Sequence, residues 1–263
     1  MNILDTIVRR KREEVATAKS KVKESTLVYS ALFERKCFSL SEYIVNSELS
    51  GIIAEFKRKS PSKPNINTTA DVQKITSGYA DAGASALSVL TDVDFFGGSN
   101  TDLLQSRDVN KIPILRKDFV IDSYQILEAK SLGADAILLI AEILTKAEID
   151  ELSKVAVDCG LEVLMEIHTA DQINKYHDRI RNIGVNNRNL KTFTTNIRYS
   201  LDIFPQLPSD TIKISESGID DPNTVIALKR FGFDGFLIGE YFMKTDDPGM
   251  AFAKFVQKLN DLK

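Results

Sequence analysis

Six side chains that can transfer protons or bind anions fall at the ends of short runs of apolar residues. They are Glu55, Lys57, Lys117, Glu166, Asn186 and Arg188. Carboxylates and amines carry out general acid and base catalysis, and an ammonium held near carboxylates in a low-dielectric pocket can protonate a developing alkoxide without a cofactor. The alternative is a network of ion pairs with only a structural role, because such networks also shift protonation.

These side chains belong to eight strand-like runs, separated by segments long enough for one helix each. The runs cover residues 52–57, 86–91, 112–117, 136–140, 162–167, 183–185, 212–215 and 235–238. Alternating strands and helices predict a parallel sheet, and eight such units in 263 residues predict a single (β/α)8 TIM barrel. The active site of that fold lies at the carboxyl ends of its strands, which is where the polar side chains occur.

Strand geometry predicts which of these side chains share a face. Because successive residues of a strand point to opposite faces, Glu55 and Lys57 should point inward together, as should Glu166 and His168. Asn186 and Arg188 should do the same if their strand extends that far. The interleaved apolar residues should face the helices; these are Ala54, Phe56, Ile167 and Val185.

Residues 1–50 precede the first predicted strand and form a helical extension of one domain, residues 1–263. Apolar residues at helical spacing predict an amphipathic first helix; they are Ile3, Leu4, Ile7 and Val8. The following run RRKREE is expected to be a solvated face, because charges of both signs are mixed in it. A second helix is expected over residues 38–45, with Ser39 or Ser41 as its cap, and later helices over residues 71–82, 123–132 and 247–259. Thr145 and Glu148 predict a capping box.

Glycine follows each of the last two strand-like runs, as Gly218 in SESGI and Gly239 in LIGE. Bare backbone N–H groups there can bind an anion, and phosphate commonly binds after strands seven and eight of this fold. Three phenylalanines lie after runs two and three, namely Phe95, Phe96 and Phe119. Local packing is their usual role. Opposite a phosphate cradle, they also suit a ligand with an aryl ring at one end and a phosphate at the other.

Composition excludes several classes of protein. The formal net charge is −3, so there is no general basic field for nucleic acid, and no apolar run approaches the ~20 residues of a membrane span. Cys37, Cys159, His168 and His177 form no metal-ligand spacing, and His177 is expected on a surface helix. The N-terminus lacks the apolar core of a secretory signal. We therefore expect a cytoplasmic protein, monomeric or a weak homo-oligomer, that acts on a phosphorylated small molecule without metal or cofactor.

Together these motifs resemble the indole-3-glycerol-phosphate synthase family of tryptophan biosynthesis. The matching segments extend over nearly the whole chain: IIAEFKRKSPS, ALSVLTD, FFGGS, ILRKDFVIDSYQI, GADAILLIA, EVLMEIH, IGVNNRNL, SESGI and DGFLIGE. The resemblance implies closure of an indole ring from 1-(2-carboxyphenylamino)-1-deoxyribulose 5-phosphate, with loss of carbon dioxide and water. This substrate carries an aryl ring at one end and a phosphate at the other.

The resemblance also implies a role for each candidate. Lys117 would protonate the carbonyl oxygen, and Glu166 would be the acid/base partner in dehydration, assisted by Glu55. Lys57 would lie near the substrate carboxylate and donate a proton in the second step. Asn186 and Arg188 would orient the carboxylate and the intermediate. The implied phosphate positions are Ser60, Ser217, Gly218, Gly239 and Glu240, and the implied apolar walls are Phe96, Phe119 and Leu190.

Two departures from the family pattern and three other functions stay open. Pro64 stands where the family usually has glycine, in a loop expected to flex, and Asn189 stands where it usually has a carboxylate beside Arg188. A phosphoribosylanthranilate isomerase would need a cysteine and an aspartate at the barrel mouth. A Schiff-base aldolase would use Lys117. The third is a barrel that binds a phosphorylated ligand without catalysis.

Overall fold

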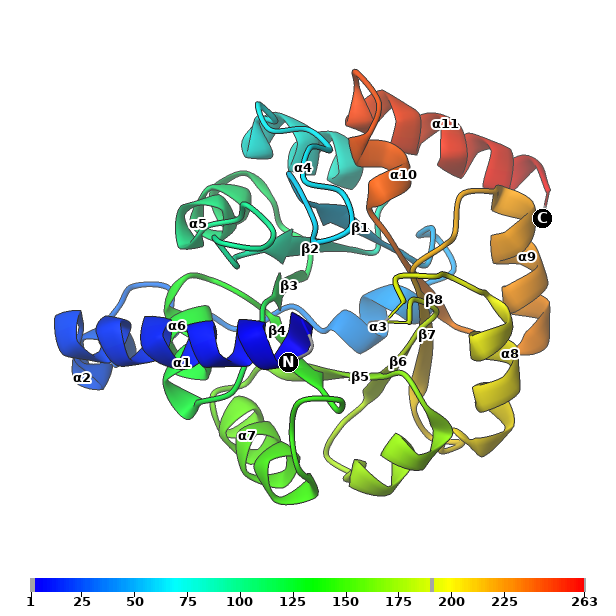
Figure 1. Cartoon of the computed structure of the whole chain (residues 1–263). Coiled ribbons are helices and arrows are strands. Elements are labelled where there is room, and N and C mark those ends of the chain that lie inside the picture. Colours follow the sequence, from blue (N-terminus) through cyan, green and yellow to red (C-terminus); the bar gives the residue numbers. More distant parts are fainter. Residues whose placement is uncertain (1–2, 190–191, 263) are drawn as a thin grey trace.

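The computed structural model describes residues 3–189 and 192–262. Within these residues, eight parallel strands close into a barrel in sequence order (Figure 1). They are β1 (Ile52–Phe56), β2 (Ala86–Leu90), β3 (Ile114–Lys117), β4 (Ala136–Ile140), β5 (Glu162–Ile167), β6 (Asn182–Asn186), β7 (Ile212–Glu216) and β8 (Gly235–Ile238). β8 pairs with β1 and closes the ring. The predicted (β/α)8 fold is confirmed.

Two strand bounds differ from the prediction in ways that matter for the site. β3 begins at Ile114 rather than at residue 112, because the proline at position 113 has no N–H to donate to the sheet. β7 continues one residue beyond Ser215, to Glu216, which pairs with Leu237 and Asn186. The carboxyl end of β7 therefore carries an acidic side chain into the barrel mouth.

Side chains alternate between the two faces of each strand, and this divides the hydrophobic core into two layers, as predicted. One set of side chains packs between the strands and the surrounding helices; it includes Ala54, Phe56, Ile167 and Val185. The other set fills the barrel interior; it includes Ile53, Leu115, Leu138, Leu164 and Ile214. Polar residues that alternate with the first set consequently point into the barrel.

The helices that surround the barrel are α4 (Val72–Asp81), α5 (Asn100–Val109), α6 (Ser123–Ser131), α7 (Lys146–Asp158), α8 (Arg198–Ile203), α9 (Pro222–Phe231) and α11 (Pro248–Asp261). A four-residue helix, α10 (Glu240–Met243), follows β8, and 3₁₀ helices η1 (Ala170–Lys175) and η2 (Phe204–Gln206) complete the connections. The Thr145–Glu148 capping box is confirmed. None of the helices in the described part of the chain is long and apolar enough to cross a membrane.

The prediction of a helix at His177 is wrong. η1 ends at Lys175, and His177 lies in the loop that leads to β6, with Nδ1 2.5 Å from Asp178 Oδ1. A 3₁₀ segment is short because its hydrogen bonds have poorer geometry than those of an α-helix. His177 therefore belongs to an irregular, half-exposed connection.

The segment before the barrel forms α1 (Ile3–Lys21), α2 (Glu24–Val28) and α3 (Leu40–Val45). Ser39 caps α3, as predicted. The hydroxyl of Ser41 bonds to Glu162 at the start of β5, and Ile44 belongs to the core of the barrel interior, so α3 closes the amino end of the barrel.

α1 crosses in front of the barrel, near the carboxyl ends of β3 and β4 (Figure 1). The expectation that its charge run is solvated is wrong for Lys11, which is 3% exposed. Lys11 lies on the same helical face as the buried residues Leu4 and Ile7, because residues three and four apart are neighbours on a helix.

Candidate active site

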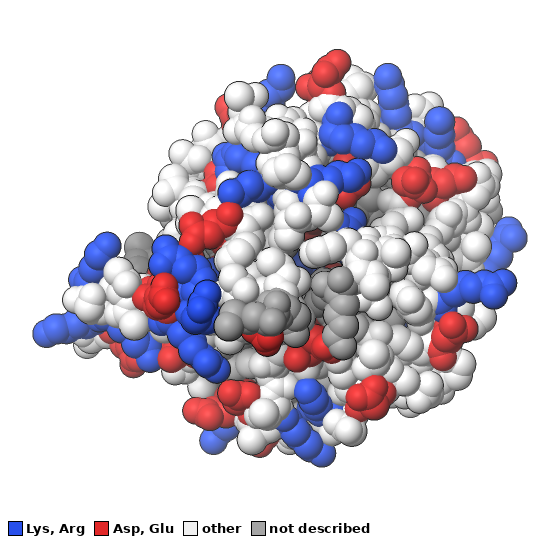
Figure 2. Space-filling view, in the orientation of Figure 1, with Lys and Arg blue, Asp and Glu red and all other residues white. Residues whose placement is uncertain are grey.

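A cavity of about 360 Å³ opens at the carboxyl ends of the strands, within the size range of small-molecule sites. The face that carries it is hollowed at its centre, and charged side chains of both signs surround the hollow (Figure 2). All six chemistry-bearing candidates line the cavity: Glu55, Lys57, Lys117, Glu166, Asn186 and Arg188. So do the described ligand-binding candidates, Ser60, Phe96, Phe119, Ser217, Gly218, Gly239 and Glu240. Leu190 lies outside the described residues.

Two lysines and three glutamates form what we call the acid–base cluster. Lys117 Nζ lies 2.6 Å from Glu216 Oε2 and 3.2 Å from Glu166 Oε2. Lys57 Nζ lies 2.7 Å from Glu55 Oε1. The five side chains come from the ends of β1, β3, β5 and β7, so the barrel brings together groups that are far apart in the sequence.

Burial and mutual charge set the protonation of this cluster. Burial alone would lower the pKa of Lys117, but Glu216, Glu166 and Glu55 raise it well above its ordinary value. Burial raises the pKa of Glu216 to about 8, and repulsion from Glu166 adds to the effect of burial. Burial would also raise the pKa of Glu166, yet Lys117 and the nearby His168 hold it below its ordinary value. With Glu216 protonated, the two ammonium groups and the two remaining carboxylates balance.

Glu216 is a candidate functional residue that the sequence motifs did not indicate. It is 1% exposed and contacts the candidate acid Lys117 directly. The predicted end of the strand at Ser215 assigned Glu216 to the phosphate-binding turn. Counting two residues on from Ile214, which faces the barrel interior, would have placed Glu216 inside as well.

Gly184 in β6 provides the space that Glu216 occupies. A methyl group at Gly184 would lie 2.0 Å from Glu216 Oε1 and 3.3 Å from Leu164 Cδ1. The shorter distance is a steric overlap, so the carboxyl group fits there because position 184 has no side chain.

We expect Gly184→Ala to reduce kcat about 100-fold, because displacement of Glu216 would misplace Lys117, the candidate proton donor. The measurement is a double-mutant cycle with Glu216→Ala, which removes the colliding carboxyl group. If the added methyl acts through Glu216, the double variant is no less active than Glu216→Ala alone. Strictly additive losses would show that Gly184 serves some other purpose.

The turn after β7 is the candidate anion-binding site. Ser217 and Gly218 both adopt left-handed backbone conformations, with φ of +70° and +77°. For serine this conformation is strained, and such strain is concentrated at functional sites. Asn187, fully buried after β6, supports the turn: its Nδ2 donates to Ser215 Oγ at 3.0 Å and to the Ser217 carbonyl at 3.1 Å. Successive backbone N–H groups in such a turn form a concavity that binds anions.

Charged contacts hold the loop after β1 over the cavity. Arg188 donates to Ser62 Oγ at 2.6 Å and to Glu240 Oε2 at 3.3 Å, and Lys63 Nζ lies 2.5 Å from Glu240 Oε1. Because β6 ends at Asn186, Arg188 is not a strand residue; its backbone N–H donates to Asn186 Oδ1 instead. The carboxylate of Glu240 thus lies between two cations.

The candidates for contact with an aryl ring form a wall of the cavity opposite the turn after β7. The rings of Phe96 and Phe119 are tilted against each other, with centroids 6.0 Å apart. Leu4 and Ile7 of α1 line the same cavity, a contribution that helical periodicity alone did not reveal. Phe95 packs beside this wall in the inner core. His168 lies behind the acid–base cluster, with Nε2 3.5 Å from Glu166 Oε1.

Fold and site together define a (β/α)8-barrel enzyme whose cavity combines a lysine–carboxylate cluster suited to proton transfer with a candidate anion-binding turn and an aromatic wall. Comparison with known proteins identifies the family within this class. The family model described as indole-3-glycerol phosphate synthase matches residues 4–255. The chain belongs to the indole-3-glycerol phosphate synthase family.

Two relatives of that name match nearly end to end. The protein from Bacteroides thetaiotaomicron is 46% identical over 258 residues, which covers 98% of this chain and 99% of the relative. The protein from Bordetella pertussis is 40% identical over 259 residues, 97% of this chain and 99% of the relative. Among solved structures, 3-hexulose-6-phosphate synthase from Salmonella typhimurium superposes with a TM-score of 0.60 at 12% identity, over 81% of this chain and 99% of the other. That likeness shows the barrel fold alone.

Proposed function

We propose that this chain converts 1-(2-carboxyphenylamino)-1-deoxyribulose 5-phosphate to indole-3-glycerol phosphate, carbon dioxide and water, with the acid–base cluster as its catalytic machinery. It is thus a decarboxylating lyase of tryptophan biosynthesis. One observation carries the assignment of the site: Lys57, Lys117, Glu55, Glu166 and Glu216 gather around one cavity. The same cavity has an anion-binding turn and an aromatic wall, which match the two ends of the substrate.

In the first step, the ring carbon that bears the carboxylate attacks the ketone carbon. The C=O electron pair becomes an alkoxide, which takes a proton from Lys117 and becomes a hydroxyl group. Loss of carbon dioxide then returns an electron pair to the ring and restores its aromaticity. Lys117 suits the donor role because neighbouring carboxylates keep it protonated, and it can be reprotonated from the buried acid Glu216 at 2.6 Å.

In the second step, the hydroxyl group leaves as water and a proton leaves the adjacent carbon, which forms the double bond of the indole. Glu166 is ionised and accepts that proton, and Lys57 donates the proton that the leaving hydroxyl needs. Glu55 holds Lys57 in place, with Oε1 2.7 Å from the Lys57 Nζ. Two acids and a base on different strands allow both steps to proceed without moving the substrate between sites.

The remaining residues bind and orient the substrate. Ser217, Gly218 and Gly239 offer backbone N–H groups to the phosphate, and Ser60 adds a hydroxyl from the loop after β1. Asn186 and Arg188 orient the substrate carboxylate. Phe96 and Phe119 contact the aryl ring, and Leu190 completes that wall in this proposal. Glu240 contributes through its backbone, because its carboxylate is engaged by Lys63 and Arg188.

The test is the rise of indole fluorescence when the purified protein meets the carboxyphenylamino ribulose phosphate. The chain contains no tryptophan, so the signal has little intrinsic background. Release of one carbon dioxide for each indole formed would confirm the stoichiometry of the reaction. Absence of both products under conditions that support folding would reject the proposal.

The alternatives are less well supported by the geometry. Neither Cys37 nor Cys159 lines the cavity, which disfavours the isomerase. A Schiff base needs a neutral amine, whereas the carboxylates around Lys117 raise its pKa, which disfavours the aldolase. Borohydride trapping with a ketose phosphate distinguishes the aldolase from the proposed lyase.

We expect kcat/KM to fall as the pH rises through about 8, the pKa of Glu216. Below that pH the Glu216 carboxyl group is neutral; above it the group ionises and adds negative charge that repels an anionic substrate. In Glu216→Gln this alkaline decline should disappear or move to higher pH. An unchanged profile would show that Glu216 does not control it.

The raised pKa of Glu216 also predicts how the stability of the fold changes with pH. Because the folded-state pKa of Glu216 is raised, its favourable contribution is complete below the ordinary carboxyl pKa and is lost as the pH rises toward about 8. The Tm of Glu216→Gln, relative to the natural protein, should therefore increase between about pH 5 and pH 9. Thermal unfolding of both proteins across that pH range shows whether the difference in Tm increases.

We further propose that the chain is a single catalytic domain, residues 1–263, and that it is monomeric or a weak homo-oligomer in the cytoplasm. The proposed catalytic residues converge on one cavity within the barrel, which is consistent with catalysis by one copy. Sedimentation of the active protein at assay concentration tests the oligomeric state.

A further inference from the structure

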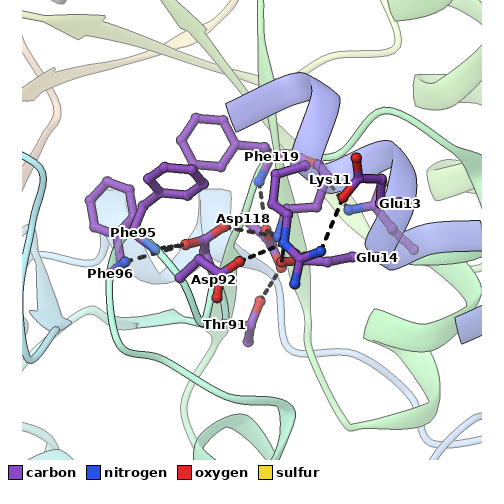
Figure 3. A network of polar contacts seen from close by, with 12 residues as sticks. Lys11, Glu13, Glu14, Thr91, Asp92, Phe95, Phe96, Asp118 and Phe119 are labelled. Carbon is purple, nitrogen blue, oxygen red and sulfur yellow. Dashed lines mark hydrogen bonds and ion pairs between the residues drawn. The ribbon is translucent and has the colours of Figure 1, made fainter. Parts of the chain in front are cut away.

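Lys11 lies at the centre of a buried ion-pair network between α1 and the ends of β2 and β3 (Figure 3). Its Nζ lies 2.9 Å from Asp92 Oδ2, 2.9 Å from Asp118 Oδ1 and 2.6 Å from Glu14 Oε2, and its side chain is 4% exposed. Burial alone would lower the pKa of Lys11, but these carboxylates raise it, so the group is an ammonium. One cation therefore joins three segments that are distant in sequence.

The two aspartates use their other contacts to hold the aromatic wall. Asp92 Oδ1 accepts the backbone N–H of Phe95 at 2.7 Å and that of Phe96 at 3.2 Å. Asp118 Oδ1 accepts the backbone N–H of Phe119 at 2.8 Å. These bonds fix the backbone of the two residues whose rings line the cavity, Phe96 and Phe119 (Figure 3).

Lys11 is the ion-pair partner of the buried Asp92. Asp92 is fully buried, and within the described residues no donor reaches its Oδ2 with hydrogen-bond geometry. The ammonium of Lys11 at 2.9 Å is the ion-pair partner that the structure shows for this atom. A buried carboxylate that loses its partner is strongly unfavourable, so the loop after β2 would rearrange without Lys11.

The helix that carries Lys11 also supplies part of the cavity wall. Leu4 lies three residues before Ile7, and Ile7 lies four residues before Lys11, so all three share one face of α1. Leu4 and Ile7 both line the cavity. The position of Lys11 relative to Asp92 and Asp118 therefore sets the position of two walls at once, one from α1 and one from the loops.

We propose that Lys11 is a positioning residue for the aryl half of the active site: through Asp92 and Asp118 it holds the wall of Phe96 and Phe119 at the distance from α1 that accepts the substrate ring. The inference rests on the proposed function and adds a residue to it. The phosphate turn lies after β7 and outside the network, so Lys11 acts on binding of the ring. Because Lys117 directly precedes Asp118, kcat is measured as well as KM.

The test compares two probes on Lys11→Met. One is the unreactive alcohol made by reducing the ketone of the substrate; the other is ribulose 5-phosphate, which lacks the ring. We expect the Kd of the aryl probe and the KM of the substrate to rise about tenfold or more, and the inhibition constant of ribulose 5-phosphate to stay within about twofold. The larger effect should fall on KM rather than on kcat.

Arg10→Met is the matched control. Arg10 also joins α1 to the loop after β2, with Nε 2.6 Å from Asp94 Oδ2, but this pair is solvent-exposed. An exposed pair contributes little, so both probes should bind this variant as they bind the natural protein. Equal weakening of the aryl probe in Arg10→Met would show that general loosening of α1, and not Lys11, is responsible.

A second variant covers the case in which Lys11→Met does not fold. Lys11→Gln combined with Asp92→Asn removes one charge of each sign and leaves Asp118 paired with Arg116. We expect selective loss of aryl binding here too. Parallel weakening of both probes, or no weakening of either, would overturn the inference. A natural protein that fails to turn over substrate would instead reject the proposed function.

Discussion

Lys117→Ala is expected to lower kcat about 10³-fold or more while the barrel stays folded, because the variant lacks the ammonium group that we propose as the proton donor to the carbonyl oxygen. The loss should exceed any change in affinity for the unreactive alcohol. Lys117 lies at the rim of the barrel, between Glu216 and Glu166, and not in the packed interior. Its removal should also raise the pKa of both glutamates, since the opposing positive charge is gone.

The matched control is Lys213→Met. Lys213 lies at the start of β7, the opposite end of the barrel, where its Nζ donates to the Thr211 carbonyl at 2.8 Å. Its turnover should equal that of the natural protein. Circular dichroism compares the folds of both variants. Turnover of Lys117→Ala within about tenfold of normal would remove Lys117 from the role of principal acid.

Glu166→Gln is expected to separate the two halves of the reaction. The amide keeps the size of the side chain but cannot accept a proton, so indole formation should fall about 10²- to 10³-fold. In the proposed mechanism, carbon–carbon bond formation and decarboxylation depend on Lys117, which keeps Glu216 as its partner in this variant. Carbon dioxide should therefore be released in a single turnover well before indole fluorescence develops.

Comparison of carbon dioxide release with indole fluorescence tests whether Glu166 acts in dehydration. Parallel loss of carbon dioxide and indole would place Glu166 before decarboxylation, and normal indole release would exclude it from dehydration. Glu216→Gln provides the control: it should slow both signals together, because it disturbs Lys117.

Much of the fold could be predicted because periodicity and strand-end chemistry are local properties. The eight strands were predicted, with small errors at their ends, and the caps at Ser39 and Thr145 were also correct. The proline before Ile114 could have corrected the start of β3. The absence of a regular helix near His177 could not be predicted, because a short 3₁₀ segment depends on tertiary packing.

The site was predicted less completely, because its energetics depend on distances between strands. Sequence indicated that Lys117 and Glu166 face the same space, and the structure places them 3.2 Å apart. Glu216 was missed through a strand end that was one residue short. Lys11 was missed for a more general reason: a charge run looks solvated until its partners, here Asp92 and Asp118, are known to lie across from it.

The position of α1 has a practical consequence for work on this enzyme. Ile3 and Leu4 line the cavity, so a purification tag or fluorescent fusion at the amino terminus would be attached beside the substrate entrance. α11, by contrast, packs against α4 and α9 on the flank of the barrel. A carboxyl-terminal tag is therefore the safer choice, and kinetic constants measured with an amino-terminal tag should be checked after the tag has been cleaved.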